Sequence, residues 1–227
     1  MKSTVPPKFY LADVGSGSFR AGYSSDGGIC MGIGNYPGAQ ASTPSLVSLA
    51  PSRLIYEPQE EGPAKPVAFG YVEPRQHQVV VENVKLAILA DRKAYEYAYS
   101  LLDSASKQLR LKSVEQIPED FLRLLVAHVI GEGGGQPTEG WVFSVPQCYS
   151  VTDVQRYRSL IQRAGAVGPI HIYGESDSVM NTSMEWIKNF TRAEQQAAFK
   201  QGRNFSIAAA VCDFGDGTTV RITNLKR

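Results

Sequence analysis

Two short segments near opposite ends of the sequence carry residue types that can bind phosphate. Residues 13–18 read Asp-Val-Gly-Ser-Gly-Ser, and residues 213–218 read Asp-Phe-Gly-Asp-Gly-Thr. Both fit Asp, an apolar residue, Gly, any residue, Gly, and Ser or Thr, and each joins two strand-like segments. Glycines let such a turn aim successive backbone N–H groups at an anion, and the hydroxyl groups add donors. One copy could be an ordinary hairpin turn, whereas two copies with the same order indicate a polyphosphate held from two sides.

The aspartates that open the two segments, Asp13 and Asp213, repel phosphate and therefore need a cation beside them. Mg²⁺ meets this need because it keeps its waters and binds through carboxylates and phosphates. The alternative that both aspartates are plain turn residues stays open. A Rossmann dinucleotide site is disfavoured, since the glycines of "GSGSFRAG" have the wrong spacing and run into a strand. A Walker loop is excluded because the sequence has no Gly-Lys-Ser or Gly-Lys-Thr.

The composition indicates a globular chain without a strong charge. Its 227 residues are 43% hydrophobic, which suits one large domain or two small ones. A net charge of +1 predicts no strong field for nucleic acid or an anionic membrane. The sequence has no apolar run of about eighteen residues and no N-terminal signal peptide, so we expect a cytoplasmic protein. The three cysteines lie far apart and predict buried thiols, and no histidine pair has metal-ligand spacing.

Periodicity and turn residues predict a mixed α/β chain. We expect strands at 8–14, 19–25, 29–35, 45–49, 141–146, 169–174, 206–215 and 218–225, and two more around a polar loop within 53–70. We expect helical structure from 72 to about 112, and helices at 118–130, 150–165, 175–190 and 191–202. Pro118 fits the first position of its helix and Gly131 its end, while Ser150 or Thr152 caps the next one.

The two glycine turns resemble those of a known superfamily. "LADVGSGSFRAGY" is similar to the first phosphate turn of the actin, hexokinase and heat-shock-chaperone ATPases, and "AVCDFGDGTTVRI" to the second. Residues 140–180 resemble the segment between those turns, most closely in the heat-shock protein 70 chaperones, which share its Val-Pro, its helix ending in Ala-Gly and its next acidic residue. The resemblance implies a ribonuclease H-like mixed sheet flanked by helices, with about 60–132 as an inserted subdomain.

The resemblance also implies ligands and residue roles. ATP or ADP would bind with Mg²⁺, whose waters would lie beside Asp13 and Asp213. Glu175 would orient the attacking water or accept its proton, and Lys85 would point at phosphate; the alternatives are a helix-capping Glu175 and a helix-surface Lys85. Asp216 replaces a chaperone glycine and adds negative charge, although actin shares it. The phosphate-holding residues would be Gly15, Ser16, Gly17, Ser18, Gly215, Asp216, Gly217 and Thr218.

In the resembled family a second lobe follows the second turn, so we expect residues 1–227 to be the first lobe alone, without a peptide-binding domain. A half-cleft predicts weak Mg-nucleotide binding and negligible turnover. Three functions stay open. The first is the ATP-binding domain of a heat-shock-protein-70-like chaperone, with client or co-chaperone partners. The second is a non-enzymatic interaction module, and the third is a sugar kinase of the same superfamily.

Overall fold

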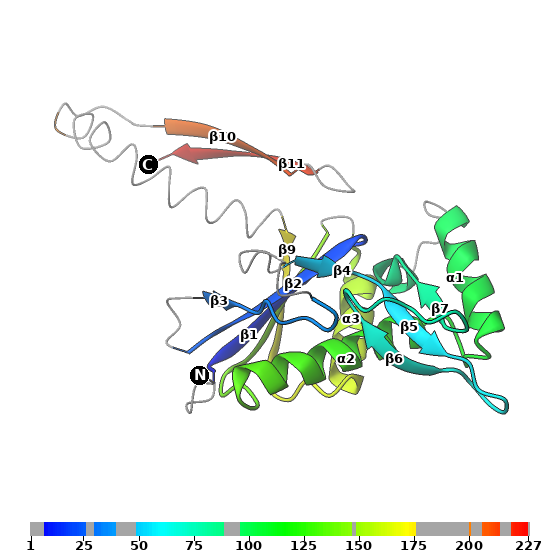
Figure 1. Ribbon diagram of the computed structural model, residues 1–227. Coiled ribbons are helices and arrows are strands. Elements are labelled where there is room, and N and C mark those ends of the chain that lie inside the picture. Colours follow the sequence, from blue (N-terminus) through cyan, green and yellow to red (C-terminus); the bar gives the residue numbers. More distant parts are fainter. Residues whose placement is uncertain are drawn as a thin grey trace. The chain divides into compact units, whose positions relative to one another are not determined.

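Figure 1 shows the computed structural model, which describes residues 7–25, 30–39, 49–88, 96–146, 149–175, 200, 206–213 and 219–226. The chain forms two compact units. The first comprises Met1–Ser144 and Tyr149–Ile172, and the second comprises Val145–Cys148 and Tyr173–Arg227.

The larger sheet is mixed, with antiparallel and parallel pairs. Its path runs β3-β2-β1-β8-β9, and β4 also pairs with β2. The central strand β1 is antiparallel to β2 and parallel to β8. Buried residues alternate with half-buried ones along β1, as expected for a strand. The strands are β1 (Phe9–Val14), β2 (Ser18–Ser24), β3 (Cys30–Gly32), β4 (Leu49–Pro51), β8 (Gly140–Val145) and β9 (Ile170–Gly174).

Two helices flank this sheet in the first unit. α2 (Gln116–Gly133) packs against β2, β6 and α3 (Val151–Arg163) (Figure 1). Ser150 caps α3 in a reciprocal capping box with Asp153, which confirms one of the two predicted caps. The predicted limits of α2 were wrong. The helix begins two residues before Pro118 and continues past Gly131, because Gly134 is the residue that adopts the left-handed conformation ending it.

A smaller antiparallel sheet has the order β6-β5-β7, from β5 (Leu54–Glu57), β6 (Lys65–Phe69) and β7 (Val79–Val81). The helical prediction for 72–112 was wrong at its start, where β7 lies. Three consecutive valines form β7 and pair with β5, as β-branched residues favour. The same stretch then contains the 3₁₀ helix η1 (Val84–Ile88) and α1 (Glu96–Gln108).

An aromatic cluster joins both sheets to α2. Phe19 of β2 is fully buried, and its ring centroid lies 4.8 Å from that of Tyr36, 5.7 Å from that of Phe69 and 5.3 Å from that of Phe121. His128 lies against Tyr36, with 5.5 Å between ring centroids, as expected for a packed histidine. The predicted α/β class, a mixed sheet flanked by helices, is confirmed.

The second unit contains the antiparallel hairpin of β10 (Ser206–Asp213) and β11 (Thr219–Lys226). Both strands were predicted. Of the two helices expected over 175–202, only Glu175 and Lys200 are described, and the rest lies outside the described residues.

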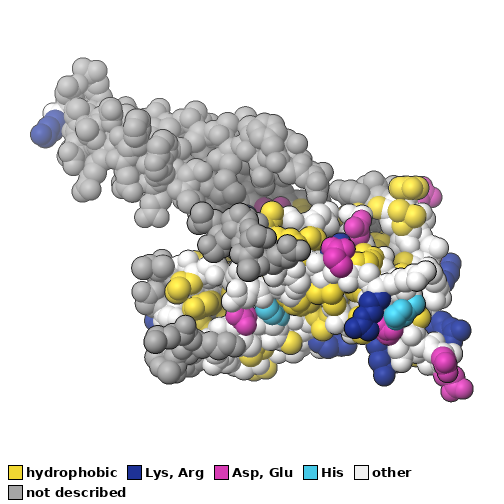
Figure 2. Space-filling model, in the orientation of Figure 1, with side chains coloured by type: hydrophobic (Ala, Val, Ile, Leu, Met, Phe, Trp, Pro, Cys, Tyr) yellow, Lys and Arg dark blue, Asp and Glu magenta, His cyan; other side chains and the backbone are white. Residues whose placement is uncertain are grey.

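The surface of the described residues carries mixed charge. On the face shown in Figure 2, Lys and Arg side chains lie among Asp and Glu side chains, as the near-neutral net charge predicts. Cys30 of the edge strand β3 is exposed, so the prediction of buried thiols was wrong for this residue. Within the described ranges, no helix combines the length and apolar character needed to cross a bilayer.

Candidate phosphate-binding site

The first predicted turn is a tight connection between β1 and β2. The Gly15 backbone N–H donates to the Ser18 carbonyl at 2.8 Å and closes the turn. A Cβ atom placed on Gly15 would lie 2.7 Å from that carbonyl oxygen, closer than real Cβ contacts come. The backbone geometry of this turn therefore requires glycine at position 15.

The turn leaves two backbone donors available to a ligand. The Gly17 carbonyl accepts from the Ser52 backbone N–H at 3.0 Å, which ties the turn to the end of β4. The N–H groups of Ser16 and Gly17 have no acceptor within the described part of the chain. Gly17 is exposed and Ser16 is half-buried. Adjacent free N–H groups at a tight turn form a concavity that favours anions.

The turn lies where ligands bind in sheets of this kind. From β1 the chain adds β2 and β3 on one side, whereas β8 and β9 lie on the other. The direction of strand addition thus changes between β1 and β8, which run parallel. In open α/β sheets, ligands bind outside the carboxyl ends of the strands at such a switch point. The last register pair of β1 and β8, Asp13 with Ser144, marks that edge.

Asp13 is held by two side chains from neighbouring strands. The Arg20 Nε atom lies 3.0 Å from Asp13 Oδ2, and the Ser144 hydroxyl donates to Asp13 Oδ1. The Asp13 side chain remains 31% exposed, so it can still face a ligand or solvent. Both oxygens of the carboxylate therefore have a donor within the chain.

Sequence reasoning missed both partners of Asp13. Arg20 could have been found, because the hairpin register places it directly opposite Asp13 on β2. Ser144 carried no such signal, since its strand pairs with β1 across 131 residues of sequence.

The described surroundings of Asp13 do not fit the expected magnesium site. An arginine guanidinium already compensates the charge of the Asp13 carboxylate. Among the described residues, no group of three or more His, Cys, Asp or Glu side chains could hold a metal ion. Mg²⁺ is usually held by carboxylates with free oxygens together with phosphate oxygens. The metal roles of Asp13 and Asp213 stay predictions from sequence.

The second predicted turn connects two antiparallel strands, as the first does. Asp213 ends β10, and its register partner is Thr219, the first residue of β11. The residues predicted to hold phosphate there, Gly215, Asp216, Gly217 and Thr218, lie outside the described residues. In the first hairpin Asp13 pairs with Arg20, seven residues later, whereas Asp213 pairs with a residue six positions later, so the two registers differ by one residue.

Glu175 directly follows β9 and belongs to the second compact unit, as Asp213 does. The helix that Glu175 was expected to open lies outside the described residues. Its proximity to Asp13, like that of Asp213, stays a prediction.

Lys85 is buried rather than on a helix surface. It belongs to η1, its side chain is 3% exposed, and its Nζ lies 6.0 Å from the ring centroid of Tyr149. The Tyr149 hydroxyl donates to the Lys85 carbonyl at 3.3 Å. The surface-lysine alternative is therefore wrong. The predicted phosphate-directed role stays a prediction.

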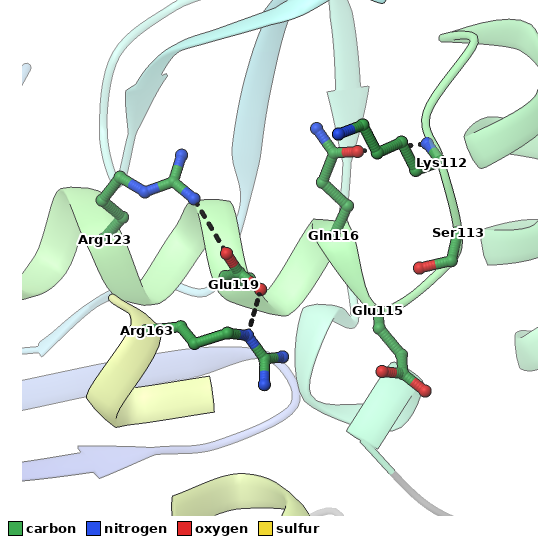
Figure 3. Close-up of a pocket in the computed structure, with 7 residues that line it drawn as sticks. All are labelled: Lys112, Ser113, Glu115, Gln116, Glu119, Arg123 and Arg163. Carbon is green, nitrogen blue, oxygen red and sulfur yellow. Dashed lines mark hydrogen bonds and ion pairs between the residues drawn. The ribbon is translucent and has the colours of Figure 1, made fainter. Parts of the chain in front are cut away.

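A hollow lies beside α2 and α3, away from the turn at 15–18 in sequence. It has a volume of about 270 Å³, and Figure 3 shows Glu119 there between Arg123 and Arg163. Glu119 Oε1 lies 3.0 Å from Arg123 Nη2, and Glu119 Oε2 lies 2.8 Å from Arg163 Nε. Because its arginines are bound to a carboxylate of the same chain, we interpret this hollow as a structural ion-pair network.

Comparisons with known proteins give a fold likeness only. No protein-family model matches the chain, and no curated protein sequence matches it. Among solved structures, the chain is similar to MreB5 of Spiroplasma citri bound to AMPPNP, at 13% identity and a TM-score of 0.48, over 99% of this chain and 53% of that one. The ADP-bound MreB5 is similar at 14% identity and a TM-score of 0.48, over 98% of this chain and 52% of that one. The chain thus spans about half the length of these structures, and likeness at this level does not establish a shared function.

Proposed function

We propose that the chain binds the phosphate groups of a nucleotide, ATP or ADP, at the turn formed by residues 15–18. One observation carries this function: at the carboxyl end of β1, beside the switch point, the N–H groups of Ser16 and Gly17 have no acceptor among the described residues. Phosphate is the ligand that such a pair of amides suits best. The sequence repeat at 213–218 supports a second contact to the same ligand.

A more specific proposal is that the chain is an ATPase of the actin, hexokinase and heat-shock-chaperone superfamily, of the heat-shock protein 70 type. The resemblance of both turns and of residues 140–180 supports it. In this assignment Glu175 positions the attacking water, Lys85 and the second turn act on phosphate, and Asp213 lies beside Mg²⁺. Client or co-chaperone partners follow from the same resemblance, and we also propose a cytoplasmic location.

We expect nucleotide binding with negligible turnover. Hydrolysis needs more than phosphate contacts, because a water must be positioned in line with the bond that breaks. Steady-state release of phosphate from ATP measures this directly. Robust turnover that Asp213→Asn abolishes would contradict the expectation and would favour a complete catalytic site.

Calorimetric titration with ATP and with ADP tests the binding itself, using Gly15→Ala as the site variant. The added methyl group meets the Ser18 carbonyl, so the turn must open and its amides must move. We expect affinity to fall at least about tenfold, which corresponds to the loss of one charge-assisted hydrogen bond.

The matched control is Gly131→Ala. A Cβ atom there meets nothing within 4 Å, and the position lies inside α2, so we expect unchanged affinity and equal or slightly greater stability. Absence of heat with either nucleotide at millimolar concentration would reject the proposed function and favour the interaction module. Heat with a sugar from a panel, and none with nucleotide alone, would favour the sugar kinase.

A further inference from the structure

We propose that Arg20 supplies, from within the chain, the positive charge that Asp13 needs beside a phosphate, so that nucleotide binds at the first turn without a divalent cation. This inference rests on the proposed function and concerns the chemistry of the same site. It starts from the disagreement between the surroundings of Asp13 and the magnesium site that the sequence predicts.

Arg20 contacts Asp13 and keeps donors that can bind phosphate. Arg20 lies opposite Asp13 in the register of β1 and β2, and its Nε atom lies 3.0 Å from Asp13 Oδ2. The side chain is 63% exposed, and the described residues offer its two Nη groups no acceptor. A guanidinium has five N–H donors, so Arg20 can keep its bond to Asp13 and still donate to an anion.

Ser144 binds the other oxygen of the same carboxylate. Its hydroxyl donates to Asp13 Oδ1, so the carboxylate is engaged at one oxygen by a cation and at the other by a neutral donor. A carboxylate compensated in this way repels phosphate much less than a bare one, because the two opposite charges lie within hydrogen-bonding distance. A bound Mg²⁺ is then no longer the only means of placing phosphate beside Asp13.

The ion pair between Asp13 and Arg20 contributes little to the stability of the fold. Ion pairs between exposed side chains contribute little to stability, because water and salt screen them and ordering two side chains costs entropy. Removing the Arg20 charge therefore leaves the protein folded, which makes its variants usable in binding measurements. Thermal unfolding of each variant checks this point.

The experiment measures the dissociation constant of ATP in the presence of EDTA and in the presence of excess Mg²⁺, for the wild type and for Arg20→Gln. For the wild type we expect the two constants to agree within about threefold. For Arg20→Gln we expect binding in EDTA to weaken about tenfold or more, and Mg²⁺ to restore most of that loss. The variant thus becomes dependent on the metal.

Two further variants separate the effect of the charge at position 20 from an effect of the net charge of the protein. Arg20→Lys keeps the charge and should retain most of the binding in EDTA, since the charge is the property proposed to matter. Lys65→Gln removes one positive charge from an exposed position of β6, far along the sequence from the turn, and should change neither constant. Equal weakening by Lys65→Gln and Arg20→Gln would show a general effect of net charge and would overturn the proposal.

The remaining outcomes separate this proposal from the proposed function. Binding by the wild type only when Mg²⁺ is present overturns the inference and leaves the nucleotide site intact. Equal losses for Arg20→Gln in EDTA and in Mg²⁺, or no loss in either, also overturn it. If the wild type binds no ATP under either condition, the proposed function fails, and the inference fails with it.

Discussion

At the scale of single residues, Asp13 shows how a site depends on neighbours that the local motif does not contain. The motif at 13–18 gives its type and its place before the turn. Arg20 and Ser144 decide its charge balance and orientation, and they come from the strands on either side. A carboxylate next to phosphate is unfavourable alone and acceptable when compensated, so these partners decide what the aspartate can do.

Ser144→Ala tests the orienting contact. Loss of the hydroxyl frees Asp13 Oδ1, and the carboxylate can then rotate toward the turn and its anion. We expect ATP affinity to fall by about threefold to tenfold, the range of one neutral hydrogen bond. Titration calorimetry measures it, with Ser159→Ala as the control, because the Ser159 hydroxyl is exposed on α3 and donates to the carbonyl four residues earlier in the same helix. Equal affinities of wild type and Ser144→Ala would contradict this role.

At the scale of elements, a buried polar contact fixes α2 against the smaller sheet. The Tyr56 hydroxyl on β5 donates to Asp120 Oδ2 at 2.9 Å, and Arg123 Nη1 lies 2.9 Å from Asp120 Oδ1. Asp120 is 1% exposed, although it is a charged residue of α2. A buried carboxylate needs such partners, because desolvation is costly otherwise.

The stability of this contact should depend on pH. Burial raises the pKa of Asp120 above its usual range, and the hydrogen bond from Tyr56 and the charge of Arg123 only partly oppose this. The folded protein then binds the Asp120 proton more tightly than the unfolded chain does. This contribution to stability is complete below the unfolded pKa of about 4 and is lost as pH rises through the raised folded pKa.

Urea unfolding of the wild type and Asp120→Asn from about pH 4 to pH 7 tests the sign. The asparagine cannot ionise, so we expect the wild type to lose stability relative to the variant as pH rises. A difference that does not change with pH, or that changes in the opposite direction, would show that the ion pair with Arg123 outweighs the burial.

At the scale of the first unit, one aromatic cluster connects the elements that carry the turn. Phe121 of α2 is 1% exposed and lies against Phe19 and Phe69, which come from the two sheets. Phe19 immediately follows the turn residue Ser18, so packing of this cluster fixes the end of the turn. A change in the core should therefore reach the site.

Phe121→Ala removes the ring that both sheets share. We expect the free energy of unfolding to fall by about 3–5 kcal/mol, because the cavity left behind cannot be filled by neighbouring elements. Chemical denaturation followed by circular dichroism measures the loss. Tyr97→Ala on α1 is the control, since this side chain is 78% exposed and its loss should change stability by no more than about 0.5 kcal/mol. Similar losses in the two variants would contradict a shared core at Phe121.

Local patterns were sufficient where local energies decide the structure. Strong alternation and turn residues predicted β1, β2, β8, β10 and β11, and the Ser150 cap with its Asp153 partner fixed the start of α3. They failed for 72–83, where three valines follow a polar stretch that contains Pro74. Pairing with β5 decides that segment, and pairing energy is not visible in the segment itself.

The sequence by itself determined the α/β class, the two hairpins and the glycine turn, because short-range sterics and hydrogen bonding specify each of them within a few residues. Only the tertiary structure decided that the turn lies at a switch point, that Ser144 contacts the Asp13 carboxylate, and that Lys85 is buried. These features depend on contacts between strands and helices far apart in sequence, and such contacts form only when the whole unit packs.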